Sequence, residues 1–218
     1  YRFSEESEEH LFNSDMVLYF ISQIMERDAM PRHLIDMNVR TDYGKLRHLV
    51  MADQRLNGNF SQLKQITETG ETVCDIVQSF PLDRLLDREN FISLLFYLGL
   101  LSFDGVKEGQ PLLRIPNLTV KKLMYEYLRE GFRDADIFRT DLWHLSGLIR
   151  KMAYRGEWKP VFDFLSQEIR NQTCVRDYLS GEKVVQSFVL AYLNVTNFFL
   201  TRSEHEADKG FADLYLEP

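Results

Sequence analysis

The sequence predicts a mainly helical protein of the α+β class, and three observations support this prediction. Apolar residues recur at helical spacing through the final third, in residues 136–158, 157–173 and 181–197. A helix, a glycine-containing hairpin and a second helix are expected in succession within residues 83–132. Apolar and polar residues alternate in residues 210–218, which is typical of a strand, here the second strand of a C-terminal β-hairpin.

The first third of the sequence combines one amphipathic helix with polar turns. Asn13 or Ser14 can cap this helix, and it is expected to end before Pro31. Residues 38–68 contain polar turns around one short helix. Residues 70–80 are short and rich in β-branched side chains, so a strand is expected there.

The middle of the sequence has the outline of a winged helix. An apolar helix is expected to begin near Asp87 and to end at Gly99, ahead of a hairpin and a helix in residues 117–132. The first helix is too apolar to lie exposed in a major groove, so packing is favoured over DNA readout. A winged helix that binds DNA would instead need phosphate contacts from its cations. The candidates are Lys107, Arg114, Lys121 and Lys122.

The composition favours a folded protein in a reducing compartment. Hydrophobic residues make up 44% of the 218 residues, which is enough for a packed core. The formal net charge of −7 argues against a surface coated with cations for non-specific nucleic-acid binding. Cys74 and Cys174 are far apart and suit neither a zinc site nor a disulfide framework. No apolar stretch has the length of a membrane span and no signal peptide is visible, so a cytoplasmic protein without membrane contact is expected.

The strongest candidates for chemistry are carboxylates near the end of the sequence. Glu182 opens a helix, Glu204 and Glu206 are expected in the turn of a hairpin, and Asp213 is expected in its second strand. Mg²⁺ prefers such oxygen ligands, and bound Mg²⁺ activates water and offsets charge on a phosphodiester. Plainer explanations stay open, because Glu182 suits the first turn of a helix and the hairpin glutamates suit a solvated turn. Asp213 is harder to explain in this way, because aspartate is depleted in strands.

Other catalytic signatures are absent from the sequence. Neither of the common glycine-rich phosphate-binding loops occurs, so these residues are not expected to bind a nucleotide through such a loop. The five histidines are scattered and show no metal-binding spacing.

The order of a helix with Glu182, a strand, a turn and a strand with Asp213 resembles the front half of a PD-(D/E)XK nuclease core. In that superfamily a glutamate on the first core helix and an aspartate on the second strand hold metal, and the next strand supplies an acid-x-lysine pair. The segments GEKVVQSFVLAYL and TNFFLTRSEHEADKGFADLYLEP resemble a bacterial branch whose members carry an AAA-ATPase-like domain ahead of the nuclease domain. The resemblance implies that Asp213 and Glu182 are catalytic carboxylates. It further implies that Asp213 and Glu206 are ligands of Mg²⁺ or Mn²⁺.

The resemblance also divides the chain into three parts. Residues 1–80 would be the end of the AAA-ATPase-like domain (its lid region), residues 81–133 a winged-helix-like connector, and residues 134–218 a helical lead-in with the first helix and strands of the nuclease-like domain. Ala212 replaces the proline of the superfamily signature, and the acid-x-lysine strand and the ATPase phosphate-binding loop are absent. The chain is therefore expected to be a middle fragment, inactive alone, of a parent that binds ATP and hydrolyses DNA.

Two other functions stay open at this point. The helical middle would serve equally well as a protein–protein interaction module without catalysis, and the winged-helix-like part would suit a DNA-binding regulator. In a truncated nuclease core the C-terminal hairpin would also lack its third strand. Its exposed edge would then favour self-association.

Overall fold

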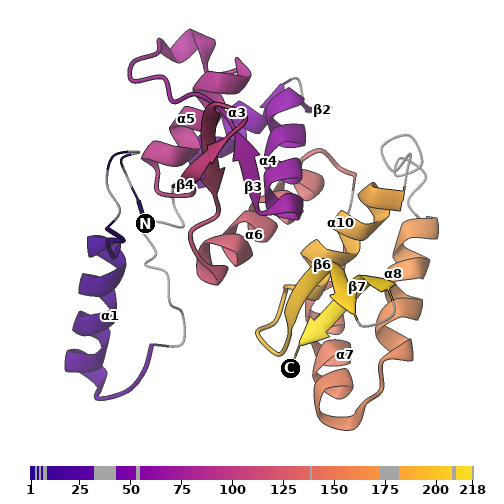
Figure 1. The fold of residues 1–218 in the computed structure, drawn as a ribbon. Helices are drawn as coiled ribbons and strands as arrows, with labels where there is room; N and C mark the ends of the chain where they lie inside the picture. Colours follow the sequence, from indigo (N-terminus) through magenta and orange to yellow (C-terminus); the bar gives the residue numbers. More distant parts are fainter. Residues whose placement is uncertain are drawn as a thin grey trace. The chain divides into compact units, whose positions relative to one another are not determined.

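The computed structural model confirms a mainly helical fold with small antiparallel sheets (Figure 1). It divides into two compact units, Tyr1–Met124 and Tyr125–Pro218, and the boundary falls within helix α6. The structure describes residues 1, 2, 4, 6, 9–31, 43–52, 55–137, 139–171, 182–207 and 210–217.

The first unit contains α1, a short helical segment, a winged-helix-like element and the first half of α6. Its elements are α1 (Ser14–Arg27), α3 (Tyr43–Val50), β1 (Met51–Ala52), β2 (Arg55–Leu56), α4 (Gly58–Thr69), β3 (Glu71–Val73), η1 (Leu82–Arg84), α5 (Arg88–Tyr97), β4 (Ser102–Lys107), β5 (Gln110–Arg114) and α6 (Leu118–Asp134).

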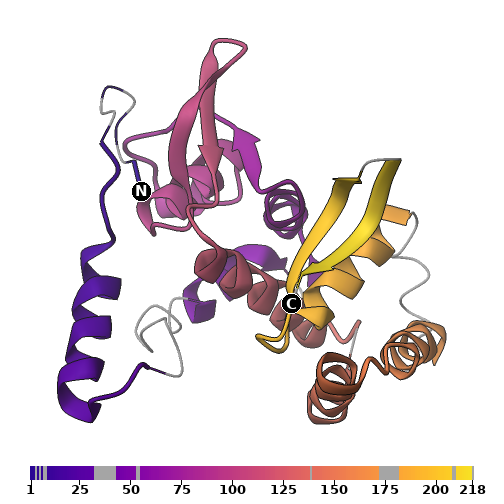
Figure 2. The ribbon, with the colours of Figure 1, turned by 60° about the horizontal axis from the view of Figure 1, so that its bottom comes forward.

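The predicted winged-helix-like element is present, and it begins earlier in the chain than the sequence indicated. Strands β3, β5 and β4 form an antiparallel sheet in that order, in which β5 pairs with both neighbours. Helix α4 precedes β3, and α5 precedes the β4–β5 hairpin, which projects beyond the neighbouring helices in Figure 2. The helix–strand–helix–hairpin order and the sheet order resemble those of a winged helix.

Helix α4 was not predicted from the sequence, which suggested polar turns around one short helix in residues 38–68. The Asn57 side chain instead accepts hydrogen bonds from the backbone N–H groups of Asn59 and Phe60, which caps the first turn of α4. Phe60, Leu63 and Ile66 then lie buried on one face of the helix. The prediction was wrong because residues typical of a turn also serve as a helix cap.

Helix α5 forms the centre of the first core, as its apolar sequence predicted. Phe91, Ile92 and Leu95 are fully buried. Ser93 is also buried, and its hydroxyl donates to the Glu89 carbonyl at 2.7 Å and accepts from the Val77 N–H at 2.9 Å. Both polar contacts make this burial tolerable, since a buried hydroxyl without partners is costly.

The second unit contains the C-terminal half of α6, a pair of helices, and a helix packed on a hairpin. Its remaining elements are α7 (Leu142–Arg155), α8 (Lys159–Asn171), α10 (Glu182–Leu193), β6 (Leu200–Ala207) and β7 (Gly210–Glu217). The two strands pair antiparallel, and β6 lies against α10 in both ribbon views (Figures 1 and 2).

None of the described helices combines a length of eighteen or more residues with the apolar composition that a bilayer span requires.

Truncation of a buried α5 side chain tests this account of the first core. We expect Leu95→Ala to lower the free energy of unfolding by about 3 kcal/mol, because the lost methyl groups leave a cavity at a fully buried site. Glu89→Ala on the exposed first turn of α5 is the control, with an expected change within about 0.5 kcal/mol. Urea denaturation followed by circular dichroism measures both. Equal losses in the two variants would contradict the assignment of α5 to the core.

Candidate functional site

The α10–β6–β7 segment carries the carboxylates that the sequence singled out. Glu182 is the first residue of α10, as predicted, and Asp213 lies within β7. Glu204 and Glu206 lie within β6 and not in the turn, so that part of the prediction was wrong. The pairing of Glu206 with Phe211 and of Ala207 with Gly210 extends the ladder to the end of the hairpin. Backbone pairing here outweighs the low strand preference of glutamate.

The register of the hairpin brings two of these positions opposite each other. Ser203 pairs with Leu214, and His205 pairs with Ala212. The residues between them, Glu204 and Asp213, therefore occupy facing positions on the two strands. Two like charges at facing positions of an antiparallel pair are unfavourable unless solvent or a cation offsets them. The side chains of Glu182, Glu204, Glu206 and Asp213 lie outside the part of the chain that the structure describes.

The two faces of the hairpin have different environments. Thr201 is buried and receives a hydrogen bond from Asn194, which directly follows α10, so the Thr201 face packs toward this helix. Side chains alternate between faces along a strand. Position 213 therefore shares a face with the exposed Tyr215, on the side away from α10. The backbone thus brings Asp213 level with Glu204, whereas Glu182 begins the helix on the opposite side of the hairpin.

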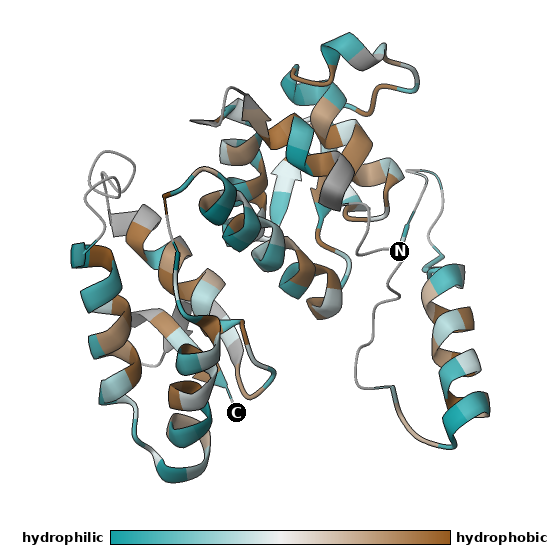
Figure 3. Ribbon diagram, turned by 180° about the vertical axis from the view of Figure 1, so that it is seen from behind, coloured by the Kyte–Doolittle hydropathy of each residue, from teal (hydrophilic) through white to brown (hydrophobic). Residues whose placement is uncertain are grey.

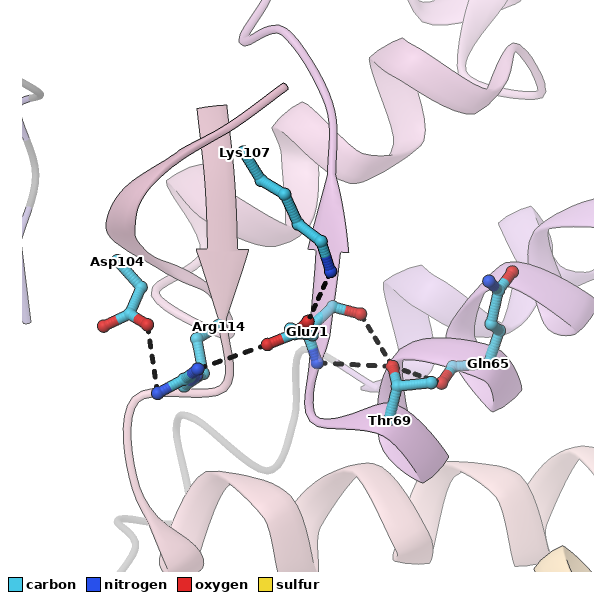
Figure 4. A network of polar contacts seen from close by, with 6 residues as sticks. All are labelled: Gln65, Thr69, Glu71, Asp104, Lys107 and Arg114. Atoms are coloured by element: carbon cyan, nitrogen blue, oxygen red, sulfur yellow. Dashed lines mark hydrogen bonds and ion pairs between the residues drawn. The ribbon is translucent and has the colours of Figure 1, made fainter. Parts of the chain in front are cut away.

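Two of the four winged-helix cations, Lys107 and Arg114, form ion pairs within their own sheet (Figure 4). Arg114 contacts Glu71 at 3.2 Å and Asp104 at 3.0 Å, and Lys107 contacts the other Glu71 oxygen at 3.3 Å. The hydrogen bond from Arg114, helped by the one from Lys107, holds the pKa of Glu71 below its usual value. Partial burial lowers the pKa of Lys122. These contacts weaken the case for phosphate binding by the wing.

A pocket of about 590 Å³ lies in the second unit between the C-terminal half of α6, the start of α7 and Tyr192. Its lining consists of Arg129, Glu130, Arg133, Asp134, Arg139, Thr140, Asp141, Leu142 and Tyr192. Arg129 donates to the Ala191 carbonyl at 2.5 Å, and Arg133 pairs with Glu130. Because arginines and carboxylates are equally numerous in this lining, the pocket does not select for ligand charge.

Tyr192 in this pocket stays protonated at neutral pH. Desolvation raises the pKa of the Tyr192 phenol to about 12, and the neighbouring Thr140 hydroxyl offsets part of this effect. Thr140 Oγ1 is itself buried, and no described residue is placed to form a hydrogen bond with it. A phenol with such a pKa is a poor general base.

Comparison of the chain with protein-family models, with curated proteins and with solved structures found no match in any of the three.

The described side chains do not form an alternative metal centre. No group of three or more histidine, cysteine, aspartate or glutamate side chains among them has an arrangement that would hold a metal ion. His144 lies beside the Phe164 ring, with centroids 5.1 Å apart. Cys74 is buried, and desolvation raises the pKa of its thiol.

The sequence did not reveal the Glu71 network, because its members come from three separate strands. Glu71 follows α4, whereas Asp104 and Lys107 lie on β4 and Arg114 lies on β5. The charged residues themselves are visible in the sequence, and in the structure β3 pairs with β5 so that Glu71 lies opposite Arg114. Only the strand pairing brings these residues into contact.

The Glu71 network gives a pH-dependent prediction. The pKa of Glu71 is lower in the folded state than in the unfolded state. The ionised carboxylate therefore stabilises the fold fully above the pKa of the unfolded state, and this stabilisation is lost as the pH falls through the pKa of the folded state. We expect Glu71→Gln to lower stability at neutral pH by less than about 1 kcal/mol, because the pairs are partly exposed. The difference from the unmodified protein should shrink toward acid pH.

Thermal unfolding measured from pH 7 to pH 3 tests this expectation. Glu108→Gln removes a carboxylate from the turn of the same wing and is the matched control, with no pH-dependent difference expected. A Glu71→Gln effect of constant size across this range would contradict an electrostatic role.

Proposed function

We propose that the β6–β7 hairpin supplies metal ligands to a phosphodiesterase site of the PD-(D/E)XK nuclease type, with Asp213 as the principal ligand. The supporting observation is the register that places Glu204 and Asp213 at facing positions on a hairpin packed on a helix. The helix–strand–strand order agrees with the order that the resemblance implies. DNA is the proposed substrate.

The donor set suits a hard divalent cation. Carboxylate oxygens are the ligands that Mg²⁺ prefers, and Mn²⁺ accepts the same set. Facing carboxylates repel each other without a counter-charge, and a cation would remove this repulsion. Bound at such a site, the metal would activate water and offset charge on the scissile phosphodiester. Glu204, which the sequence analysis expected in the turn, is thus the proposed partner of Asp213 in binding the metal.

The proposal covers only part of a complete nuclease site. Ala212 stands where the superfamily signature has proline, and no acid-x-lysine strand follows β7 in these residues. The roles of Glu182 and Glu206 in this site stay predictions. Position 182 lies on the other side of the hairpin from Asp213. ATP binding is not proposed for these residues, since they contain neither phosphate-binding loop.

Metal titration with two carboxylate variants tests the site. We expect Mn²⁺ to bind this chain, and we expect both Asp213→Asn and Glu204→Gln to weaken the affinity about tenfold or more, because each removes one anionic ligand. Asp136→Asn is the matched control, because it also removes an exposed carboxylate. The backbone of residue 136 is left-handed, and asparagine tolerates this conformation as aspartate does. Isothermal titration calorimetry provides the measurement.

Plasmid cleavage by the natural protein that contains this chain is the second readout. Cleavage that requires Mg²⁺ or Mn²⁺ and disappears in Asp213→Asn would support the proposal. Unchanged metal affinity in both carboxylate variants would overturn it.

A second candidate function, protein–protein interaction, is favoured by α1. This helix has no buried residue, although it carries apolar residues along its length (Figure 3). Leu18 is 65% exposed and Met25 is 80% exposed. An apolar helix surface in water is unfavourable and is typical of a segment that another protein covers.

Polar substitution on α1 tests this second candidate. We expect the double variant Leu18→Ser with Met25→Ser to change the free energy of unfolding by no more than about 1 kcal/mol, because both side chains are exposed. Light scattering should show less self-association if α1 contacts other copies. Strong destabilisation would show that α1 packs within its own unit and would contradict this role.

A further inference from the structure

One face of α7 combines exposed aromatic side chains with exposed cations. We call it the α7 face, and its residues are Trp143, Gly147, Arg150, Lys151 and Tyr154, together with Trp158 just after the helix. None of these residues has a role in the hairpin site proposed above.

The amphipathic pattern of α7 determines which residues form this face. Leu145, Ile149 and Met152 are buried at helical spacing, and α7 packs against α8. The opposite side of the helix must therefore face solvent. Most amphipathic helices place charged and polar residues there, whereas α7 also places a tryptophan and a tyrosine there.

The aromatic side chains of the α7 face are exposed, and two of them, Tyr154 and Trp158, contact a neighbouring ring. Trp143 is 86% exposed, Tyr154 is 76% exposed and Trp158 is 60% exposed. Tyr154 makes an edge contact with Phe198, and Trp158 makes one with Phe162, with ring centroids 5.5 Å and 6.2 Å apart. Large rings in water are unfavourable, and three within one short segment indicate a surface that contacts a ligand.

The charge of α7 is the opposite of that of the whole chain. The chain carries a formal net charge of −7, whereas α7 contains Arg150, Lys151 and Arg155 and no aspartate or glutamate. Arg150 and Lys151 are exposed and form no ion pair with any other described residue. Arg155 is only 3.9 Å from Glu157, a weak and exposed pair. The α7 face therefore suits an anionic ligand.

Gly147 opens space between the aromatic residues. Glycine in the interior of an exposed helix destabilises it by up to about 1 kcal/mol relative to alanine. Apart from its chain neighbours and the backbone of α7 itself, no described residue has an atom within 4 Å of the position where a Cβ would stand, so packing against the described residues does not explain the glycine. Its absence of a side chain lets a ligand backbone approach the helix closely.

We propose that the α7 face binds a single strand of nucleic acid. Trp143, Tyr154 and Trp158 would stack on unpaired bases, and Arg150 and Lys151 would contact phosphates. Exposed aromatics interleaved with cations are the combination by which proteins hold single strands, because every base has a stacking face. A duplex does not offer such faces, since its bases are already stacked. This binding does not depend on the metal site.

Fluorescence anisotropy with a labelled 12-nucleotide oligo(dT) tests the proposal, in EDTA so that metal binding plays no part. We expect binding at 50 mM salt with quenching of tryptophan fluorescence, and a plot of log affinity against log salt with a slope of about −1.4 for two phosphate contacts. Trp143→Ala should weaken binding about tenfold through lost stacking, and Trp143→Phe should restore most of it. Arg150→Ser with Lys151→Ser should also flatten the salt dependence.

Lys107→Ser is the matched control, because it removes one exposed cation from the wing and none from the α7 face. Oligo(dT) binding should not change in this variant, and circular dichroism should show that every variant is folded. Three results would overturn the proposal: no oligo(dT) binding at 50 mM salt, an unchanged affinity in Trp143→Ala, or an equal loss in Lys107→Ser. Preferential quenching by poly-glutamate would assign the α7 face to an acidic protein partner instead.

Discussion

The C-terminal part of the protein depends on one buried polar contact between α10 and the hairpin. The Asn194 side-chain amide donates to the Leu190 carbonyl at 2.8 Å and to the Thr201 hydroxyl. Asn194 and Thr201 are both buried, and loss of either partner would leave an unsatisfied polar group at a cost of about 1–3 kcal/mol. This contact fixes which face of β6 is covered, and side-chain alternation then determines the face on which positions 204 and 213 lie.

Much of the fold was predictable because hydrophobic periodicity is a local property. The helix at α5, the wing hairpin and the two C-terminal strands follow directly from residue spacing. Helix α4 was missed because Asn57, Gly58 and Asn59 have the composition of a turn, while their effect depends on the apolar residues that follow. Local composition alone does not distinguish a helix cap from a turn.

For the candidate site, the sequence singled out Asp213 but did not pair it with Glu204. Asp213 stood out because an acid is rare in a strand, and the structure keeps it in β7. The facing position of Glu204 requires the hairpin register, and a shift of one residue would place it on the other face. The basic character of α7 was visible in the sequence, but its significance depends on knowing which side of the helix is buried.

The β6–β7 sheet has a further consequence, which concerns the amide protons. Among the described residues this sheet has two strands, so each strand pairs along one side only. In an antiparallel pair, alternate N–H groups point away from the partner strand. Half of the hairpin amides should thus exchange rapidly with deuterated water while their neighbours exchange slowly. Slower exchange at the rapidly exchanging positions would indicate that another strand, from this or another chain, pairs with the outer edge of the hairpin.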